Sequence, residues 1–366
     1  MSRGPLFGGA PILLVAIAGI IVLFSLLPVL YLVAREGLDF DTVRRFLHSP
    51  STRTLTIDTI ELVIAVTITT TVIGVVLATI VSSTDLPGRR FWTVMFTLPL
   101  GVPAFVSSYT WVALSFEYAP QSRVLYSFPG VLLVLSLSLY PYVYLPTVAA
   151  LRGLGRSRFS AYMQVSLPLL RRPISGGALI IALHVVAEYG AIQLLRYQTL
   201  TTSIVQRALY LGAADAARAL SLVLLALVIL ASAYLLLRAA AVPIRIGAGV
   251  AAPMTPWRLG FLRWPLLLFS AGFSALSLGA PLFGMLRGLQ EIVFQSNQVD
   301  WNELWLAARV TILYAFSGAV VCSFLALFVS LLITRYPSRL SIVLERLAWI
   351  SHSLPGVIVA LALIYF

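Results

Sequence analysis

Long apolar runs dominate the chain, and short stretches rich in arginine or proline separate them. A helix rising 1.5 Å per residue needs about 20 apolar residues to cross the hydrocarbon core of a membrane. Runs of about that length lie at 12–33, 57–81, 91–115, 128–149, 174–195, 219–237, 264–286 and 305–333, and a ninth run begins near 347 and is still apolar at Phe366. The pattern predicts an all-α polytopic membrane protein with about 8–9 transmembrane helices.

Composition supports this interpretation and excludes a soluble protein. Hydrophobic residues make up 60% of the 366 residues and charged residues only 10%, whereas a soluble domain carries about 25% charged residues. The net charge is +12, and all 25 basic residues are arginine. Because the arginines lie between apolar runs, we interpret them as topological signals and expect no nucleic acid partner.

The arginines predict the orientation of the chain. If the N-terminus is cytoplasmic, the cytoplasmic segments hold 15 arginines and two acids, Asp85 and Glu345, and the other side holds 10 arginines and 11 acids. The excess of arginine on one side favours this topology. The first run follows Arg3 and is too long for the core of a signal peptide, so we expect it to remain as the first spanning helix.

Two parts of the chain resemble each other. The stretch from Thr59 to Pro103 and the stretch from Asn302 to Val357 each contain a spanning helix, an arginine- and proline-containing loop, and a helix opened by a Leu-Pro step. Because six predicted helices separate the repeats, both halves have the same orientation, unlike inverted repeats. The prediction is a first six-helix unit at 1–237, a cytoplasmic linker at 238–263, and an incomplete second unit at 264–366.

The loop between the fourth and fifth runs, 149–173, has five arginines and no acid. It also holds a partly amphipathic segment just before a Leu-Pro step, which is too short to span and is suited to a groove on a partner protein. A plain positive-inside loop is the alternative interpretation.

This loop resembles the coupling loop of permease subunits of binding-protein-dependent ABC importers. In that family, Glu-Ala-Ala precedes a glycine, and a Leu-Pro step ends thirteen residues after the glycine, the spacing found here between Gly155 and Pro168. The opening glutamate is absent, and in a second fit the Glu-Ala-Ala stretch itself is missing, so the loop is degenerate or shortened. The resemblance assigns ATPase coupling to Ala149, Ala150, Arg152, Gly155, Arg158, Phe159, Leu167 and Pro168.

Three further segments resemble the branch of this family that handles ferric iron or thiamine. They begin at His184, Tyr197 and Leu211 and read HVVAEYGA, YQTLTT and LGAADAA. Members of that branch are often double-length, so we expect this chain to be a truncated chain or a fragment of a longer permease.

The resemblance implies a permease that forms the translocation pathway in a bacterial inner membrane. The expected partners are an ATP-binding cassette ATPase dimer, a periplasmic or lipid-anchored substrate-binding protein, and membrane lipid. Ferric iron is the expected substrate, with thiamine, polyamine, sulfate or phosphonate as alternatives and an ion-gradient-driven secondary transporter as another. We expect no cofactor in this chain, with ATP and Mg on the partner, because a chain without lysine cannot form a P-loop.

Five residues are candidates for the pathway or its gate. His184 and Glu188 are four residues apart on one helix face, and an ionisable side chain inside a membrane is costly. Tyr189 follows them, and Pro99 and Pro103 flank a predicted kink. The alternatives are a Glu188 near the outer end that is either hydrated or paired with Arg196, and a kink that serves packing alone. One His and one Glu are too few for a metal site.

Overall fold

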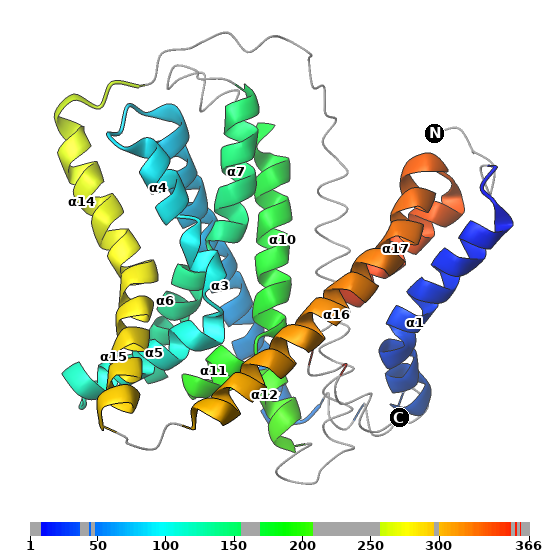
Figure 1. Cartoon of the computed structure of the whole chain (residues 1–366), viewed down its shortest axis with the longest axis horizontal. Coiled ribbons are helices and arrows are strands. Elements are labelled where there is room, and N and C mark those ends of the chain that lie inside the picture. Colours follow the sequence, from blue (N-terminus) through cyan, green and yellow to red (C-terminus); the bar gives the residue numbers. More distant parts are fainter. Residues whose placement is uncertain are drawn as a thin grey trace. The chain divides into compact units, whose positions relative to one another are not determined.

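Helices form nearly all of the structure that the chain adopts (Figure 1). The computed structural model describes residues 9–36, 44, 48–154, 169–207, 257–295, 300–352, 356 and 359. Within these ranges no strand is formed, and one isolated parallel bridge joins Thr84 to Trp257. The chain divides into a smaller unit, Met1–Phe40 with Gly288–Phe366, and a larger unit, Asp41–Arg287. The predicted all-α class is confirmed.

Three helices lie side by side at the centre of the larger unit (Figure 1): α3 (Pro50–Ser83), α7 (Pro141–Leu154) and α10 (Arg171–Ala187). Glycine permits their close approach. A Cβ atom at Gly177 of α10 would lie 2.6 Å from the backbone oxygen of Tyr142, and one at Gly74 of α3 would lie 3.0 Å from the backbone nitrogen of Tyr144. Small residues are typical of such interfaces in membranes, where dispersion contacts drive helix association.

The run at 91–115, where the prolines predicted a kink, forms two helices bent by 92°. Helix α4 (Arg89–Met95) is followed by a short 3-10 helix, η1 (Leu98–Gly101), and then by α5 (Ala104–Tyr118). Pro99 and Pro103 explain the break. Proline has no N–H for the helical ladder, and Pro103 keeps the preceding Val102 in an extended conformation, with φ −102° and ψ 112°.

Helix α6 (Phe128–Leu139) continues into α7 through Tyr140, whose backbone angles are helical, and the two form one span, Phe128–Arg152. The next predicted span is interrupted. The run predicted at 174–195 is not one helix, because α10 ends at Ala187; α11 (Gly190–Leu194) and α12 (Leu200–Val205) then follow. A hydrophobic run of the right length therefore predicts the span but not its continuity.

Helices α14 (Arg263–Ser274) and α15 (Ala280–Gln295) are joined by a π-helix at Ala275–Gly279. The α14 ring of Phe273 contacts those of Phe96 and Tyr140, with centroids 6.2 and 5.0 Å apart. The first span of the predicted second permease unit thus packs among helices of the predicted first unit.

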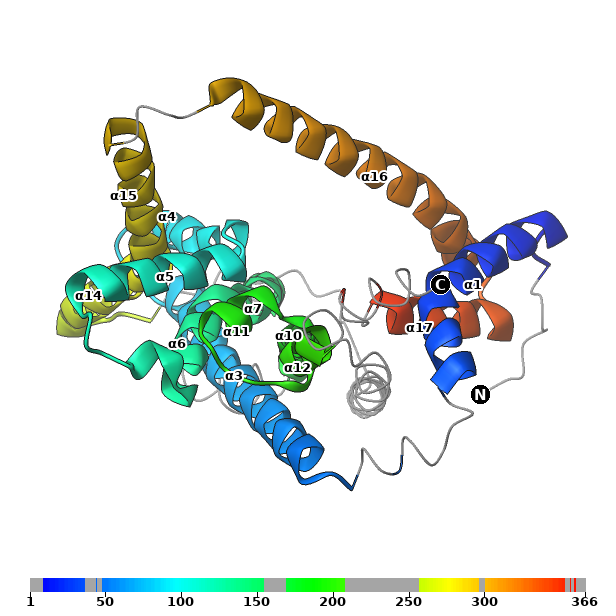
Figure 2. The same cartoon turned by 90° about the horizontal axis from the view of Figure 1, so that it is seen from below.

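The smaller unit consists of α1 (Ile12–Glu36), α16 (Trp301–Arg335) and α17 (Arg339–His352). Figure 2 shows α1 beside α17 and the end of α16. Their shared core is small and apolar, and it consists of Ala18, Val22, Leu26, Leu332 and Leu344. Helix α1, from the predicted first permease unit, thus packs with helices of the predicted second unit, just as α14, from the predicted second unit, packs among helices of the first.

Four described helices are long and apolar enough to cross a membrane, and five if the bent pair is one span. They are Pro50–Ser83, Phe128–Arg152, Gly260–Gln290 and Trp301–Arg335, with the bent pair Arg89–Gly101 and Ala104–Tyr118. Ile12–Pro28 and Pro173–Ala187 are shorter apolar helices. The span predicted at 219–237 and most of the linker predicted at 238–263 lie outside the described residues.

The close contact between α7 and α10 yields a stability prediction. We expect Gly177→Ala to lower stability by about 1–3 kcal/mol, the usual cost of overpacking, because the added methyl group meets backbone atoms of α7. Thermal unfolding of the detergent-solubilised chain measures this change. Gly176→Ala is the matched control, because a Cβ there meets nothing within 4 Å. Equal melting temperatures for the two variants would contradict the packing described here.

Candidate functional site

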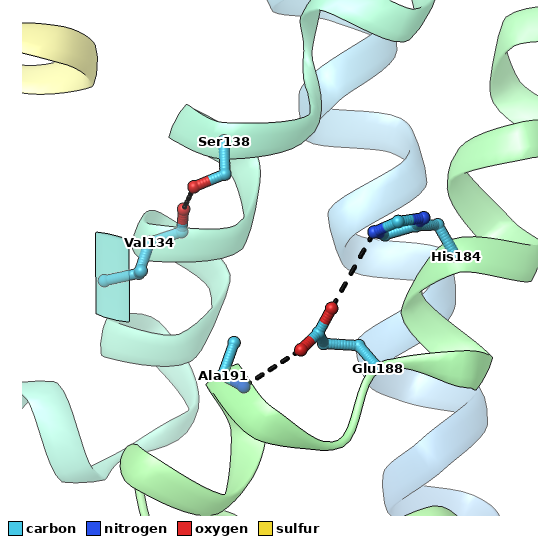
Figure 3. Close-up of polar contacts among 5 residues, drawn as sticks. All are labelled: Val134, Ser138, His184, Glu188 and Ala191. Atoms are coloured by element: carbon cyan, nitrogen blue, oxygen red, sulfur yellow. Dashed lines mark hydrogen bonds and ion pairs between the residues drawn. The ribbon is translucent and has the colours of Figure 1, made fainter. Parts of the chain in front are cut away.

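Glu188 lies where α10 ends, and its carboxylate stabilises the break that follows. Its backbone is extended, with φ −71° and ψ 120°, so the helix cannot continue. Its Oε1 accepts a hydrogen bond of 2.9 Å from the N–H of Ala191, in the first turn of α11 (Figure 3). A carboxylate at a helix N-terminus satisfies a free backbone donor and interacts favourably with the helix dipole. Glu188 therefore helps to define the geometry of the break.

The other carboxylate oxygen faces a histidine. Glu188 Oε2 lies 3.7 Å from His184 Nε2, one turn earlier on α10 (Figure 3). The His184 side chain is 40% exposed and that of Glu188 only 14%. The imidazole ring lies 5.6 Å from the ring of Tyr142 on α7. The two residues predicted as neighbours on one helix face do form a pair, and the pair is accessible through His184.

The structure brings two helix breaks together. Gly190, next to Glu188 and Tyr189, lies against Phe105 in the first turn of α5, so closely that a Cβ atom at Gly190 would be 2.8 Å from the ring. Pro103 immediately precedes α5, and α11 packs along α5. The break after Pro99 and the break at Glu188 are therefore in contact, although the sequence separates them by about ninety positions.

Ser138, on the neighbouring helix α6, does not join this pair. Its hydroxyl donates to the Val134 carbonyl oxygen of its own helix at 3.1 Å (Figure 3). Serine often satisfies itself in this way inside a membrane helix. The described polar partners of Glu188 are thus His184 and the α11 backbone.

Threonine side chains anchor the chain after the break. Thr199 and Thr202 form a capping box at the start of α12. Thr201 donates to the carbonyl oxygen of Val186 at 2.6 Å, and the N–H of Leu200 donates to the hydroxyl of Thr59 on α3 at 2.9 Å. These bonds hold α12 against both α10 and α3. Sequence reasoning missed them, although threonine directly before an apolar run is a signal for a helix cap.

Two acidic side chains of α3 affect the pKa of Tyr197, a residue in the segment after the helix break. Tyr197 lies between α11 and α12, and burial raises the pKa of its phenol, with the carboxylates of Asp58 and Glu61 acting in the same direction. Burial and the negative charge of these two carboxylates therefore both disfavour the phenolate of Tyr197.

Arg196 does not pair with Glu188, which was one alternative raised by the sequence. Its guanidinium lies over the ring of Tyr126, 5.4 Å from the centroid, as a cation–π contact. Among the described residues, the ion-pair partner of Glu188 is His184 and not Arg196. Arg196 also has φ +53°, a left-handed conformation that is uncommon for a residue with a side chain.

The predicted coupling residues fall partly within the structure. Ala149, Ala150 and Arg152 lie in the last turns of α7, where Ala149 and Arg152 are exposed and Ala150 is half-buried. The remaining five residues assigned to coupling, Gly155, Arg158, Phe159, Leu167 and Pro168, lie outside the described residues. The two ends of the loop are nevertheless fixed, because Leu151 and Leu170 are buried in one cluster.

In the part of the chain that the structure describes, no group of three or more His, Cys, Asp or Glu side chains could hold a metal ion. A cavity of about 560 Å³ opens elsewhere, between α5 and the α14–α15 helix, and residues such as Trp111, Leu114 and Phe283 line it. It is apolar and does not include Glu188 or His184.

Comparison with known proteins identifies the family. No protein-family model matches the chain. The chain is 31% identical over 356 residues to the Fe(3+)-transport system permease protein FbpB 2 of Haemophilus influenzae, an alignment that covers 93% of this chain and 69% of that protein. Similarity of this extent agrees with the predicted resemblance and with the apolar helices described above. The chain therefore belongs to the permease subunits of binding-protein-dependent ABC importers, in the branch of the Fe(3+)-transport permeases.

Proposed function

We propose that this multi-pass inner-membrane protein forms the pathway of an ATP-driven importer that takes up ferric iron from an extracytoplasmic binding protein. The observation that carries the proposal is the 31% identity, over most of the chain, to a permease named for Fe(3+) transport. The N-terminus is cytoplasmic in this proposal, as the arginine distribution indicates. ATP hydrolysis takes place on a separate ATPase dimer, because this chain contains no lysine for a P-loop.

In this proposal, the translocation pathway for the substrate runs alongside the two helix breaks. Non-helical backbone at membrane depth is tolerated where protein buries it or where it lines a water-filled cavity. Pro99 and Pro103 interrupt one helix, Glu188 and Tyr189 interrupt another, and Gly190 packs against Phe105 between them. Glu188 supplies a negative charge at this junction, which favours the passage of a cation. His184 and its contact with Tyr142 orient that carboxylate.

The coupling loop connects this pathway to the ATPase. It joins the end of α7 to the start of α10, and α10 leads directly to Glu188. A displacement of the loop by the ATPase would therefore move the helix that carries the gate. The cluster around Leu151 and Leu170 makes this a movement of packed helices rather than of the loop alone.

The first prediction tests the proposed function directly. Vesicles that contain this chain in its full transporter, with its ATPase and binding protein, should accumulate radioactive ferric iron only when ATP is supplied. ATPase binding should be detectable by co-purification from detergent. Uptake of labelled thiamine, polyamine, sulfate or phosphonate in place of iron would reassign the substrate. Uptake driven by an ion gradient without the ATPase would instead identify a secondary transporter.

A second prediction separates the charge of Glu188 from its capping role. Glu188→Gln keeps an oxygen that accepts from the N–H of Ala191 but removes the negative charge. We expect it to lower iron uptake by roughly tenfold, the effect of losing about 1.4 kcal/mol of stabilisation of the passing cation, without changing the melting temperature. Glu188→Ala should lower uptake and also destabilise the protein by about 1 kcal/mol, because the cap is lost.

Glu303→Gln provides the control for this pair of variants. Glu303 is an exposed carboxylate in the first turn of α16, in the smaller unit. It should transport iron at the wild-type rate. Wild-type uptake by Glu188→Gln would show that Glu188 only caps α11 and does not act on the substrate.

A further inference from the structure

The segment that leads into α14 is joined to the loop that follows α3, about 170 positions away in the sequence. The N–H of Trp257 donates to the carbonyl oxygen of Ser83 at 2.9 Å, and the N–H of Asp85 donates to the carbonyl oxygen of Trp257 at 3.1 Å. The N–H of Leu259 then donates to Asp85 Oδ1 at 2.8 Å. We call these three hydrogen bonds the Asp85 clasp.

The clasp satisfies backbone groups that helix ends leave free. Ser83 is the last residue of α3, so its carbonyl oxygen has no partner within the helix. Asp85 is the member of the clasp that contributes a side chain, and a carboxylate accepting from a backbone N–H forms a strong, charge-assisted hydrogen bond. Only a few residues separate Leu259 from α14, which begins at Arg263.

Trp257 connects the clasp to the ends of the coupling loop. Its half-buried side chain packs against the cluster that contains Leu151, at the end of α7, and Leu170, at the start of α10. Phe273 of α14 packs against the same cluster. Both ends of the coupling loop and two points on the α14 segment therefore meet in one close-packed group of side chains.

We propose that the Asp85 clasp transmits movement of the coupling loop to α14, the first span of the predicted second permease unit. Close-packed side chains transmit displacement because they leave no free volume to absorb it. Without the clasp, α14 would contact the cluster through Phe273 but its cytoplasmic end would not be held. Asp85 is thus a positioning residue. The proposal rests on the proposed function, since it requires an ATPase that moves the loop.

The first test examines the clasp in the purified chain by amide hydrogen exchange. Asp85→Ala removes the acceptor for the N–H of Leu259, and we expect that amide to exchange at least about tenfold faster. Asp85→Asn keeps an oxygen acceptor and should restore slow exchange. Asp85 is exposed, so neither variant disturbs the core. Equally slow exchange in Asp85→Ala, or fast exchange in Asp85→Asn, would overturn the hydrogen-bonded clasp.

The second test examines transmission in the complete transporter. Asp85→Ala should retain ATPase binding and ATP hydrolysis but transport severalfold less iron per ATP hydrolysed, and Asp85→Asn should restore the ratio. A purely structural role would lower both activities together and would overturn the proposal, as would a wild-type ratio in Asp85→Ala. Absence of ATP-driven uptake by the wild-type chain would instead overturn the proposed function, and the transmission role with it, while hydrogen exchange still decides whether the clasp exists.

Discussion

A membrane interior offers no water to a free backbone N–H or C=O group, and this constraint governs where the helices of this protein can break. At each break near the candidate site, the chain supplies its own partners. Glu188 accepts from Ala191 at the start of α11, and Thr201 donates to the carbonyl of Val186 at the end of α10. Thr199 and Thr202 cap α12. Polar side chains at these positions thus allow a helix to end inside an otherwise apolar layer.

The same constraint explains why the breaks gather in one place. A break needs neighbours that bury its irregular backbone, and the contact between Gly190 and Phe105 provides this for two of them. The junction is consequently the part of the larger unit where polar groups, a carboxylate and an imidazole lie among apolar helices. The proposed pathway for a charged substrate rests on that combination.

The first helix of each predicted permease unit packs with helices of the other predicted unit. Helix α1 packs with α16 and α17, whereas Phe273 of α14 contacts Phe96 and Tyr140, the residues that directly follow α4 and α6. Each predicted permease unit therefore contributes its first helix to a compact unit formed mainly by the other. The hydrogen bond from the N–H of Leu259 to Asp85 holds the segment that leads into α14, one of these two helices.

The sequence by itself determined the membrane class, the positions of several spans and the family, because hydrophobicity over about 20 residues and short motifs are local properties. It also indicated Glu188, His184 and the proline pair as unusual residues within spans. Only the tertiary structure decided that the run at 91–115 bends by 92°, that α10 ends at Ala187, and that these two breaks touch. Which helices are neighbours depends on contacts between distant residues such as Gly190 and Phe105, or Asp85 and Leu259, and no local pattern encodes them.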